Sequence, residues 1–188
     1  ALEYYQKVLA IFLEKLGADH PDVAISYNNI GGAYDKKGKY DNALEHYQKA
    51  LAIRLKKLGP EHPKVASSYN NIGSAHDAKG EYDKALEYYQ KSLAIWLKQL
   101  GPDHPDVARS YNNIGLVYRK KGEYDKALEH HQKALAIKLK KLDPEHPSVA
   151  MSYGNIGKVH VKKGEHDKAL ELYRKSLAIK IKKLGPEH

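Results

Sequence analysis

Histidine is the residue type in this sequence with the widest chemical repertoire, but its spacing argues against a metal site. Eleven histidines occur among the 188 residues. Those that precede a proline recur every 42 residues, at His20, His62, His104 and His146. Ligands of one zinc ion must all come within about 2.1 Å of it, whereas packed helices that carry successive copies would lie about 8–10 Å apart. We therefore expect no metal site and no cofactor.

The sequence also lacks the arrangements that catalytic sites need. It contains no cysteine, which excludes thiolate nucleophiles and disulfides. No Gly-x-Ser-x-Gly turn occurs, and the segment Gly154–Lys158 has the wrong spacing for a phosphate-binding loop. Carboxylate pairs such as Glu81 and Asp83 recur every 42 residues, as solvated helix caps would. We expect a protein that is not an enzyme.

The net charge of +9 draws attention to acidic partners. The cations gather where apolar periodicity ends, as at Arg119, Lys120 and Lys121, and cations there complement a helix dipole. No interleaving of aromatic and basic residues, which would stack and hold bases, accompanies them. The charge therefore favours a protein over a nucleic acid as the partner.

Nothing in the sequence suggests contact with a membrane. No apolar run reaches the length of about 20 residues that a spanning helix needs. The first residues, ALEYYQ, are not a basic segment followed by an apolar one, so no signal peptide is expected. We expect a cytoplasmic protein.

The elements that position these residues come from one segment copied along the chain. Each copy opens with an alanine, and the copies begin at Ala1, Ala43, Ala85, Ala127 and Ala169. The repeat is therefore 42 residues long, with four complete copies and about half of a fifth. A fixed period of this length is typical of a solenoid, in which each repeat buries its apolar face against its neighbours.

Each repeat reads as two helices joined by a short turn. Apolar residues recur every three or four positions in 1–16 and again in 22–37, and Gly17 and Gly38 follow these segments. Helices joined by so short a turn must lie antiparallel. Asp143 replaces glycine at one of the later exits. The chain is thus predicted to be all-α, a single solenoid domain over 1–188, with a half-repeat helix at 1–17 and helix pairs at about 22–59, 64–101, 106–143 and 148–185.

Three short motifs carry a resemblance to a known family. These are Tyr-Asn-Asn-Ile-Gly, Lys-Gly-x-Tyr-Asp-x-Ala-Leu-Glu and Tyr-Gln-Lys-Ala-Leu. They resemble the tetratricopeptide repeat, with Gly31 and Ala43 at its small positions and Tyr34 and Tyr47 at its aromatic ones. The 42-residue length resembles the variant found in kinesin light chains. The resemblance implies a right-handed superhelix of helix pairs that serves as a protein-binding scaffold.

The resemblance also implies that the first helix of each pair lines a concave groove. Asn28, Asn70 and Asn112 would form a ladder of amides, able either to bond an extended peptide backbone or only to satisfy neighbouring helices. Cations would bias the groove toward acidic peptides. The candidate cations are Lys36, Arg109, Arg119, Lys120, Lys158 and Lys162.

An alternative function follows from the terminal helices, 1–16 and 169–184. Each lacks one neighbouring helix, yet each is as apolar as its internal counterparts, and uncapped solenoid ends favour association. The alternative is a structural array that forms homo-oligomers through these ends. A separate expectation concerns His76, His131 and His160, which replace tyrosines: if buried and neutral, they should lower stability below about pH 6.

Overall fold

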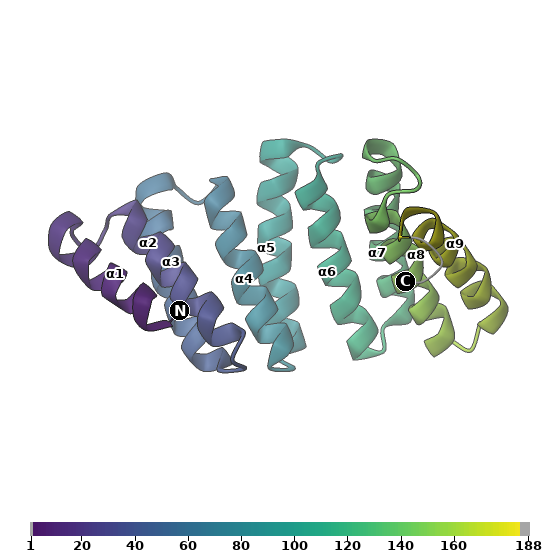
Figure 1. Cartoon of the computed structure of the whole chain (residues 1–188), viewed down its shortest axis with the longest axis horizontal. Coiled ribbons are helices and arrows are strands. Elements are labelled where there is room, and N and C mark those ends of the chain that lie inside the picture. The colour runs from purple at the N-terminus through teal and green to yellow at the C-terminus, as the bar shows by residue number, and fades with distance from the viewer. Residues whose placement is uncertain (1, 185–188) are drawn as a thin grey trace. The chain divides into compact units, whose positions relative to one another are not determined.

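Every regular element in residues 2–184, the part of the chain that the computed structural model describes, is an α-helix (Figure 1). The prediction of an all-α repeat fold is confirmed. The helices are α1 (Leu2–Leu16), α2 (Pro21–Asp35), α3 (Tyr40–Leu58), α4 (Pro63–Ala78), α5 (Tyr82–Leu100), α6 (Pro105–Lys121), α7 (Tyr124–Lys141), α8 (Pro147–Lys162) and α9 (His166–Leu184).

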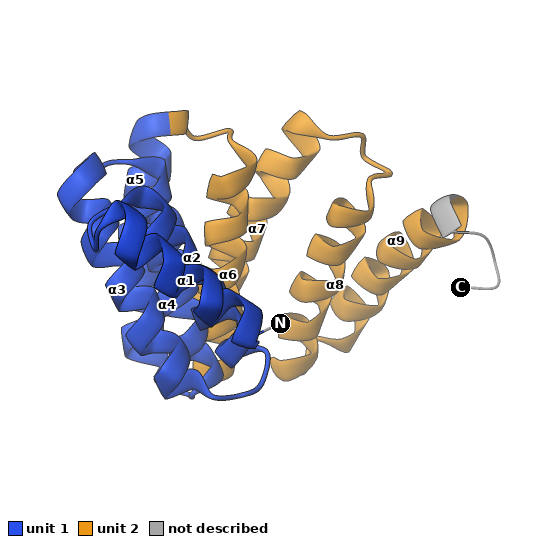
Figure 2. Ribbon diagram, turned by 60° about the vertical axis from the view of Figure 1, so that its left-hand side comes forward, with its two compact units in different colours: residues 1–99 blue, residues 100–188 orange. Residues whose placement is uncertain are grey.

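The chain divides into two compact units, 1–99 and 100–188 (Figure 2). In the first unit, α1 packs on α2, α2 on α3, and α3 on α4. In the second unit, α6 packs on α7, α7 on α8, and α8 on α9. Below, α2, α4, α6 and α8 are called first helices, and α3, α5, α7 and α9 second helices.

The recurrent His-Pro step starts each first helix. The proline occupies the opening turn, where its missing N–H costs nothing. The histidine before it is the N-cap, and its Nδ1 accepts a hydrogen bond from a backbone N–H two residues on. In α4, for example, His62 accepts from the Lys64 N–H at 3.0 Å. The four histidines that could have suggested a metal therefore begin helices.

Glycine lets the backbone turn after the second helices, and the one exception has a visible effect. Gly59 and Gly101, after α3 and α5, have φ of +80°. Asp143 stands at the same place after α7, and no described residue other than glycine has a positive φ. Instead, α7 ends at Lys141, one residue earlier in the repeat than α3 does at Leu58.

The core of each repeat depends on a close approach between the two helices of a pair. A Cβ on Gly31 of α2 would lie 2.7 Å from the ring of Tyr47 on α3. Valine and alanine fill the rest: Val23 and Ala24 of α2 are fully buried and pack against α1 and α3. The first helices therefore carry small side chains where the two helices of a pair meet, and the second helices contribute large side chains that pack against them.

Candidate peptide-binding pockets

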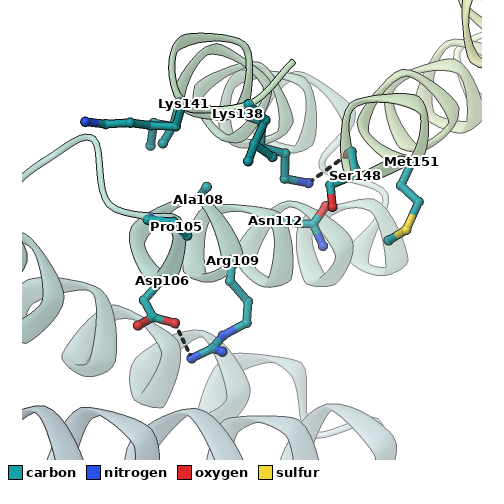
Figure 3. Close-up of a pocket in the computed structure, with 11 residues that line it drawn as sticks. Pro105, Asp106, Ala108, Arg109, Asn112, Lys138, Lys141, Ser148 and Met151 are labelled. Carbon is teal, nitrogen blue, oxygen red and sulfur yellow. Dashed lines mark hydrogen bonds and ion pairs between the residues drawn. The ribbon is translucent and has the colours of Figure 1, made fainter. Parts of the chain in front are cut away.

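A pocket of about 330 Å³ opens in the second unit, between α6, the end of α7 and the start of α8 (Figure 3). Its walls are apolar, from Ala108, Ile137, Leu142 and Met151, and its remaining lining is mostly charged. The full lining is Pro105, Asp106, Ala108, Arg109, Asn112, Ile137, Lys138, Lys141, Leu142, Ser148 and Met151. Met151 is 59% exposed, so this wall is open to solvent.

The three cations around this pocket are held differently. Arg109 makes an ion pair with Asp106, with Nη2 and Oδ1 2.9 Å apart, and its side chain stays 52% exposed. Lys138 is directed toward α8, where its Nζ donates to the Ser148 carbonyl at 3.2 Å (Figure 3). The same Nζ donates to Ser152 Oγ at 2.8 Å. Burial lowers the pKa of Lys138. Arg109 and Lys141 are thus the exposed cations of this pocket.

The same place in the repeat is also hollow in the first unit. A pocket of about 100 Å³ lies there, lined by Pro21, Ala24, Ile25, Ile53, Arg54, Lys57, Leu58 and Lys64. Each lining residue stands two repeats before a residue of the larger pocket. Arg54 repeats the bonds of Lys138, since its Nη1 donates to the Lys64 carbonyl at 3.2 Å and to Ser68 Oγ at 2.7 Å. Ile25 takes the place of Arg109, so the smaller pocket is more apolar.

The added length of the repeat builds one wall of both pockets. The tetratricopeptide pattern that the chain resembles usually spans 34 residues, so a 42-residue repeat holds eight residues more, enough for about two helical turns. These residues follow the pattern at the end of the second helix, and they include Ile53 to Leu58 in the first unit and Ile137 to Leu142 in the second. Ile137, Lys138 and Leu142 were not among the predicted site residues because those predictions came from the first helices. The recurrent Ile-x-Leu-Lys-Lys-Leu segment was the available signal.

The predicted asparagine ladder is used mainly between helices. Asn71 Nδ2 donates to Asn28 Oδ1 at 2.9 Å in the first unit. Asn155 Nδ2 donates to Asn112 Oδ1 at 2.9 Å in the second. At Asn28 and Asn112, therefore, the carbonyl oxygen satisfies a neighbouring helix. Asn70, the third member of the ladder, is half-buried on α4.

Asn28 nevertheless lines a further pocket, of about 550 Å³, in the first unit. Lys36 and Lys37 lie on it with Asn29 and Asn71, and Tyr47 forms part of its base. Burial, with the nearby Asp35 carboxylate, raises the pKa of Tyr47 to about 12, so its hydroxyl stays protonated. This pocket brings together two of the residues predicted for the site, Asn28 and Lys36.

The other predicted cations are divided between surface and interior. Lys120 on α6, and Lys158 and Lys162 on α8, are exposed. Arg119 is half-buried, and its Nε is enclosed with no hydrogen-bond partner among the described residues. Arg119 lies close enough to His131 to help lower the pKa of that imidazole. It therefore contributes less to the surface than its place in the pattern suggested.

Residues 2–184 hold no group of three or more histidine, aspartate or glutamate side chains arranged to bind a metal ion. None of the nine helices between Leu2 and Leu184 combines the length and apolarity needed to cross a membrane.

Comparison with known structures places the fold. The chain is similar to BtubC (BKLC) from P. vanneervenii, with a TM-score of 0.84, 27% identity, and coverage of 95% of this chain and 71% of that one. It is also similar to the nearly identical TPR-like repeats of a putative kinesin light chain from Podosopora anserina, with a TM-score of 0.83, 29% identity, and coverage of 96% and 85%. The apo form of RapI shares the fold, at a TM-score of 0.82 and 24% identity over 97% of this chain and 64% of that one.

Sequence comparison agrees with the structural one. No curated protein matches the chain. The family model for the tetratricopeptide repeat matches residues 1–56, 36–96, 78–140 and 106–182. Members of this family typically serve as scaffolds for protein–protein interaction, and the matched segments cover nearly the whole chain. The chain belongs to the tetratricopeptide repeat family.

Proposed function

We propose that this protein is a non-catalytic scaffold that binds extended, acidic segments of partner proteins along its first helices. The observation that carries the proposal is the apolar pocket between α6, α7 and α8, bordered by Arg109 and Lys141. A partner would insert an apolar side chain there and place carboxylates against the two cations. The smaller pocket of the first unit would hold a second apolar side chain of similar or smaller size.

Apolar contacts and ion pairs would contribute differently to binding. Burying one large apolar side chain stabilises a complex by about 1.5–3 kcal/mol, whereas an exposed ion pair contributes about 0.2–1 kcal/mol. The apolar walls would therefore supply most of the affinity, and the cations would select the sign of charge and speed association. A volume of about 330 Å³ is at the small end of ligand sites, which suits one side chain better than a cofactor.

The asparagines would contribute through side-chain amide groups that the hydrogen bonds between helices do not use. The side-chain nitrogen of Asn112 lies at the pocket and makes no hydrogen bond with another described residue. An amide nitrogen in this position can donate to a peptide carbonyl. The side-chain oxygen of Asn112 thus bonds a neighbouring helix, and its side-chain nitrogen would bond a ligand.

Selection from a peptide library tests this proposal. We expect the protein to select peptides with an apolar residue beside aspartate or glutamate, and the Arg109→Glu variant to weaken their binding about tenfold. Arg174→Glu, which reverses the charge of an exposed arginine on α9 outside both pockets, is the matched control and should leave binding unchanged. Equal selection of acidic, neutral and basic peptides would contradict the proposal.

Self-association is the second candidate function, and the exposure of the terminal helices favours it. Tyr4 and Ile11 of α1 are 67% and 49% exposed, and α9 exposes several large apolar side chains. Association through these surfaces would not need the pockets at all. Sedimentation equilibrium over a wide concentration range should then show dimers or larger species, and a constant monomer mass would exclude this candidate.

A further inference from the structure

Lys138 is a pocket-lining amine that the proposed contacts with a ligand do not use. Its side chain is half-buried, and its Nζ donates to the Ser148 carbonyl at 3.2 Å and to Ser152 Oγ at 2.8 Å. Figure 3 shows this amine directed toward Ser148, on the side of the pocket where Asn112 lies. Both acceptors are uncharged, and Lys138 forms no ion pair with another residue of 2–184. The amine is therefore held in place without a negative charge against it.

The other lysines whose pKa the structure shifts are affected in the opposite sense. Lys49 and Lys91 pair with Glu45 and Glu87, at 2.7 and 2.6 Å, and these hydrogen bonds raise the pKa of both lysines. Burial lowers the pKa of Lys138. The nucleophile of a lysine is its neutral amine, and removal from water increases the share of that form. The surroundings of Lys138 thus favour reaction of its amine.

The repeat itself supplies the comparison for Lys138. Arg54 holds the same position two repeats earlier and makes the equivalent two bonds to α4, but a guanidinium stays protonated and is not a nucleophile. Lys180 holds the position on α9, where it is exposed. Trp96 holds it on α5 and has no amine. Of these four described residues, Lys138 alone combines an amine with a pocket.

The lining of the pocket selects the kind of reagent. Three cations, Arg109, Lys138 and Lys141, and one carboxylate, that of Asp106, lie around it, so the local potential attracts anions. The apolar walls suit a short hydrocarbon group. A volume of about 330 Å³ is too small for a donor that carries its acyl group on a large carrier. A small acyl phosphate meets these conditions, because it has an anionic leaving group and a short acyl chain.

We propose that Lys138 is an acylation site, modified by small acyl phosphates that enter this pocket. In the reaction, the neutral Nζ attacks the acyl carbonyl carbon and a C–N bond forms. The C–O bond to the phosphate breaks, and inorganic phosphate leaves with the electron pair and with the proton that the nitrogen gives up. The product is an uncharged amide, and no oxidant or further reactant takes part.

The modification regulates the same pocket, and this consequence rests on the proposed function. Acylation removes the positive charge of Lys138 and places the acyl group against the apolar walls, where the side chain of a ligand would lie. The amide N–H can still donate to one acceptor on α8, either the Ser148 carbonyl or Ser152 Oγ. Acidic peptides should then bind about threefold more weakly, as for the loss of one exposed ion pair.

Acetyl phosphate tests the modification site without any peptide. The full chain is incubated with the reagent at pH 7.5, and the acetylation of each lysine is followed by mass spectrometry. We expect Lys138 to react at least about threefold faster than Lys180, its exposed counterpart on α9. The Lys138→Arg variant should show no acetylation at this position while Lys180 still reacts. Equal or slower acetylation of Lys138 would overturn the proposal.

A neutral reagent tests the class of donor. N-Acetoxysuccinimide carries the same acetyl group on an uncharged leaving group, so the cations around the pocket should not attract it. The preference for Lys138 over Lys180 should be larger with acetyl phosphate than with this ester, and Arg109→Glu should reduce it for acetyl phosphate alone. The same preference with both reagents would show that an acyl phosphate is not the donor.

Peptide binding separates the site from its consequence. Lys138→Gln, an uncharged mimic of the acylated side chain, should bind the selected acidic peptide about threefold more weakly than Lys138→Arg, which keeps the charge as Arg54 does. Equal binding by these two variants would overturn the regulatory role. If the unmodified protein bound no acidic peptide, the proposed function would fail, whereas the acetylation rates of Lys138 and Lys180 would still decide the modification site.

Discussion

Asn155 of α8 donates its side-chain amide to the Asn112 carbonyl oxygen of α6 at 2.9 Å, beside the pocket between α6, α7 and α8. The bond joins the first helices of successive repeats inside the second unit. Asn71 and Asn28 repeat the bond in the first unit. In both bonds the asparagine at the second position of the motif, Asn71 or Asn155, donates backward to the asparagine at the first position one repeat earlier, Asn28 or Asn112.

Removing the donor should destabilise the protein by a predictable amount. Asn155→Ala leaves the half-buried Asn112 oxygen unpaired, which should lower the free energy of unfolding by about 1 kcal/mol. Asn29→Ala is the matched control. Asn29 has the same place in its repeat but is exposed on α2, so its substitution should cost little. Urea denaturation of both variants measures the difference, and equal losses would show that the bond contributes nothing.

The His131 imidazole should make stability depend on pH. Burial, with the charges of Arg119 and Lys138, lowers the pKa of His131 to about 4. Neither ring nitrogen has a hydrogen-bond partner among the described residues. In the unfolded chain the pKa is about 6.5. Between these values the unfolded state binds the additional proton, so stability falls as pH decreases through this window, by up to about 3 kcal/mol.

Unfolding in urea at pH 7.5 and pH 5 checks this dependence. The His131→Phe variant should lose most of it, because a phenyl ring does not titrate. The comparison should not go below pH 5, because Glu81 and Glu165, whose pKa values neighbouring lysines and histidines hold at about 2, lose their ion pairs in stronger acid. The same stability at both pH values in the unmodified protein would contradict this account of His131.

His76 and His160 differ from His131 in having a side-chain partner. Their Nδ1 atoms lie 2.6 Å from Glu81 Oε2 and 2.8 Å from Glu165 Oε2. The expectation that protonating these two rings would oppose folding stays a prediction.

Adjacent glycines on α2 should respond in opposite directions to alanine. A Cβ on Gly31 would meet the Tyr47 ring at 2.7 Å and the Ala43 carbonyl at 3.2 Å, and overpacking of this kind costs about 1–3 kcal/mol. On Gly32 the nearest atom would be the Tyr47 hydroxyl at 3.7 Å, so Gly32→Ala should gain up to about 1 kcal/mol of helix propensity. Thermal unfolding of the two variants measures both effects. A stabilised Gly31→Ala protein would show that the helices can separate freely.

Much of the architecture could be read from the sequence because the pattern is local. The apolar spacing of 1–16 and 22–37 predicted helices that the structure places at Leu2–Leu16 and Pro21–Asp35. Turn chemistry was also readable, except after α7, where Asp143 cannot take the glycine conformation cheaply and the helix ends early. The capping role of His20 and its copies was not predicted, because histidine is an uncommon N-cap.

The site was harder to predict from the sequence, because it depends on how the helices of successive repeats are offset against one another. Asn28 bonds Asn71, which is one repeat and one residue further along, and no periodicity in the sequence specifies that offset. Arg109 and Arg119 were both predicted to line the groove. In the structure Arg119 is half-buried beside His131, whereas Arg109 is exposed at a pocket. Ile137 and Leu142 entered the pocket from the second helix, which the family resemblance had not assigned to the groove.

The measurement that bears most directly on the proposed function is a titration of the protein with an acidic peptide selected from the library. We predict that amide shifts concentrate in 105–112, 137–142 and 148–151, that they saturate, and that raising the salt concentration weakens binding without moving the site. Shifts spread evenly over all helices, or confined to residues far from this pocket, would contradict it.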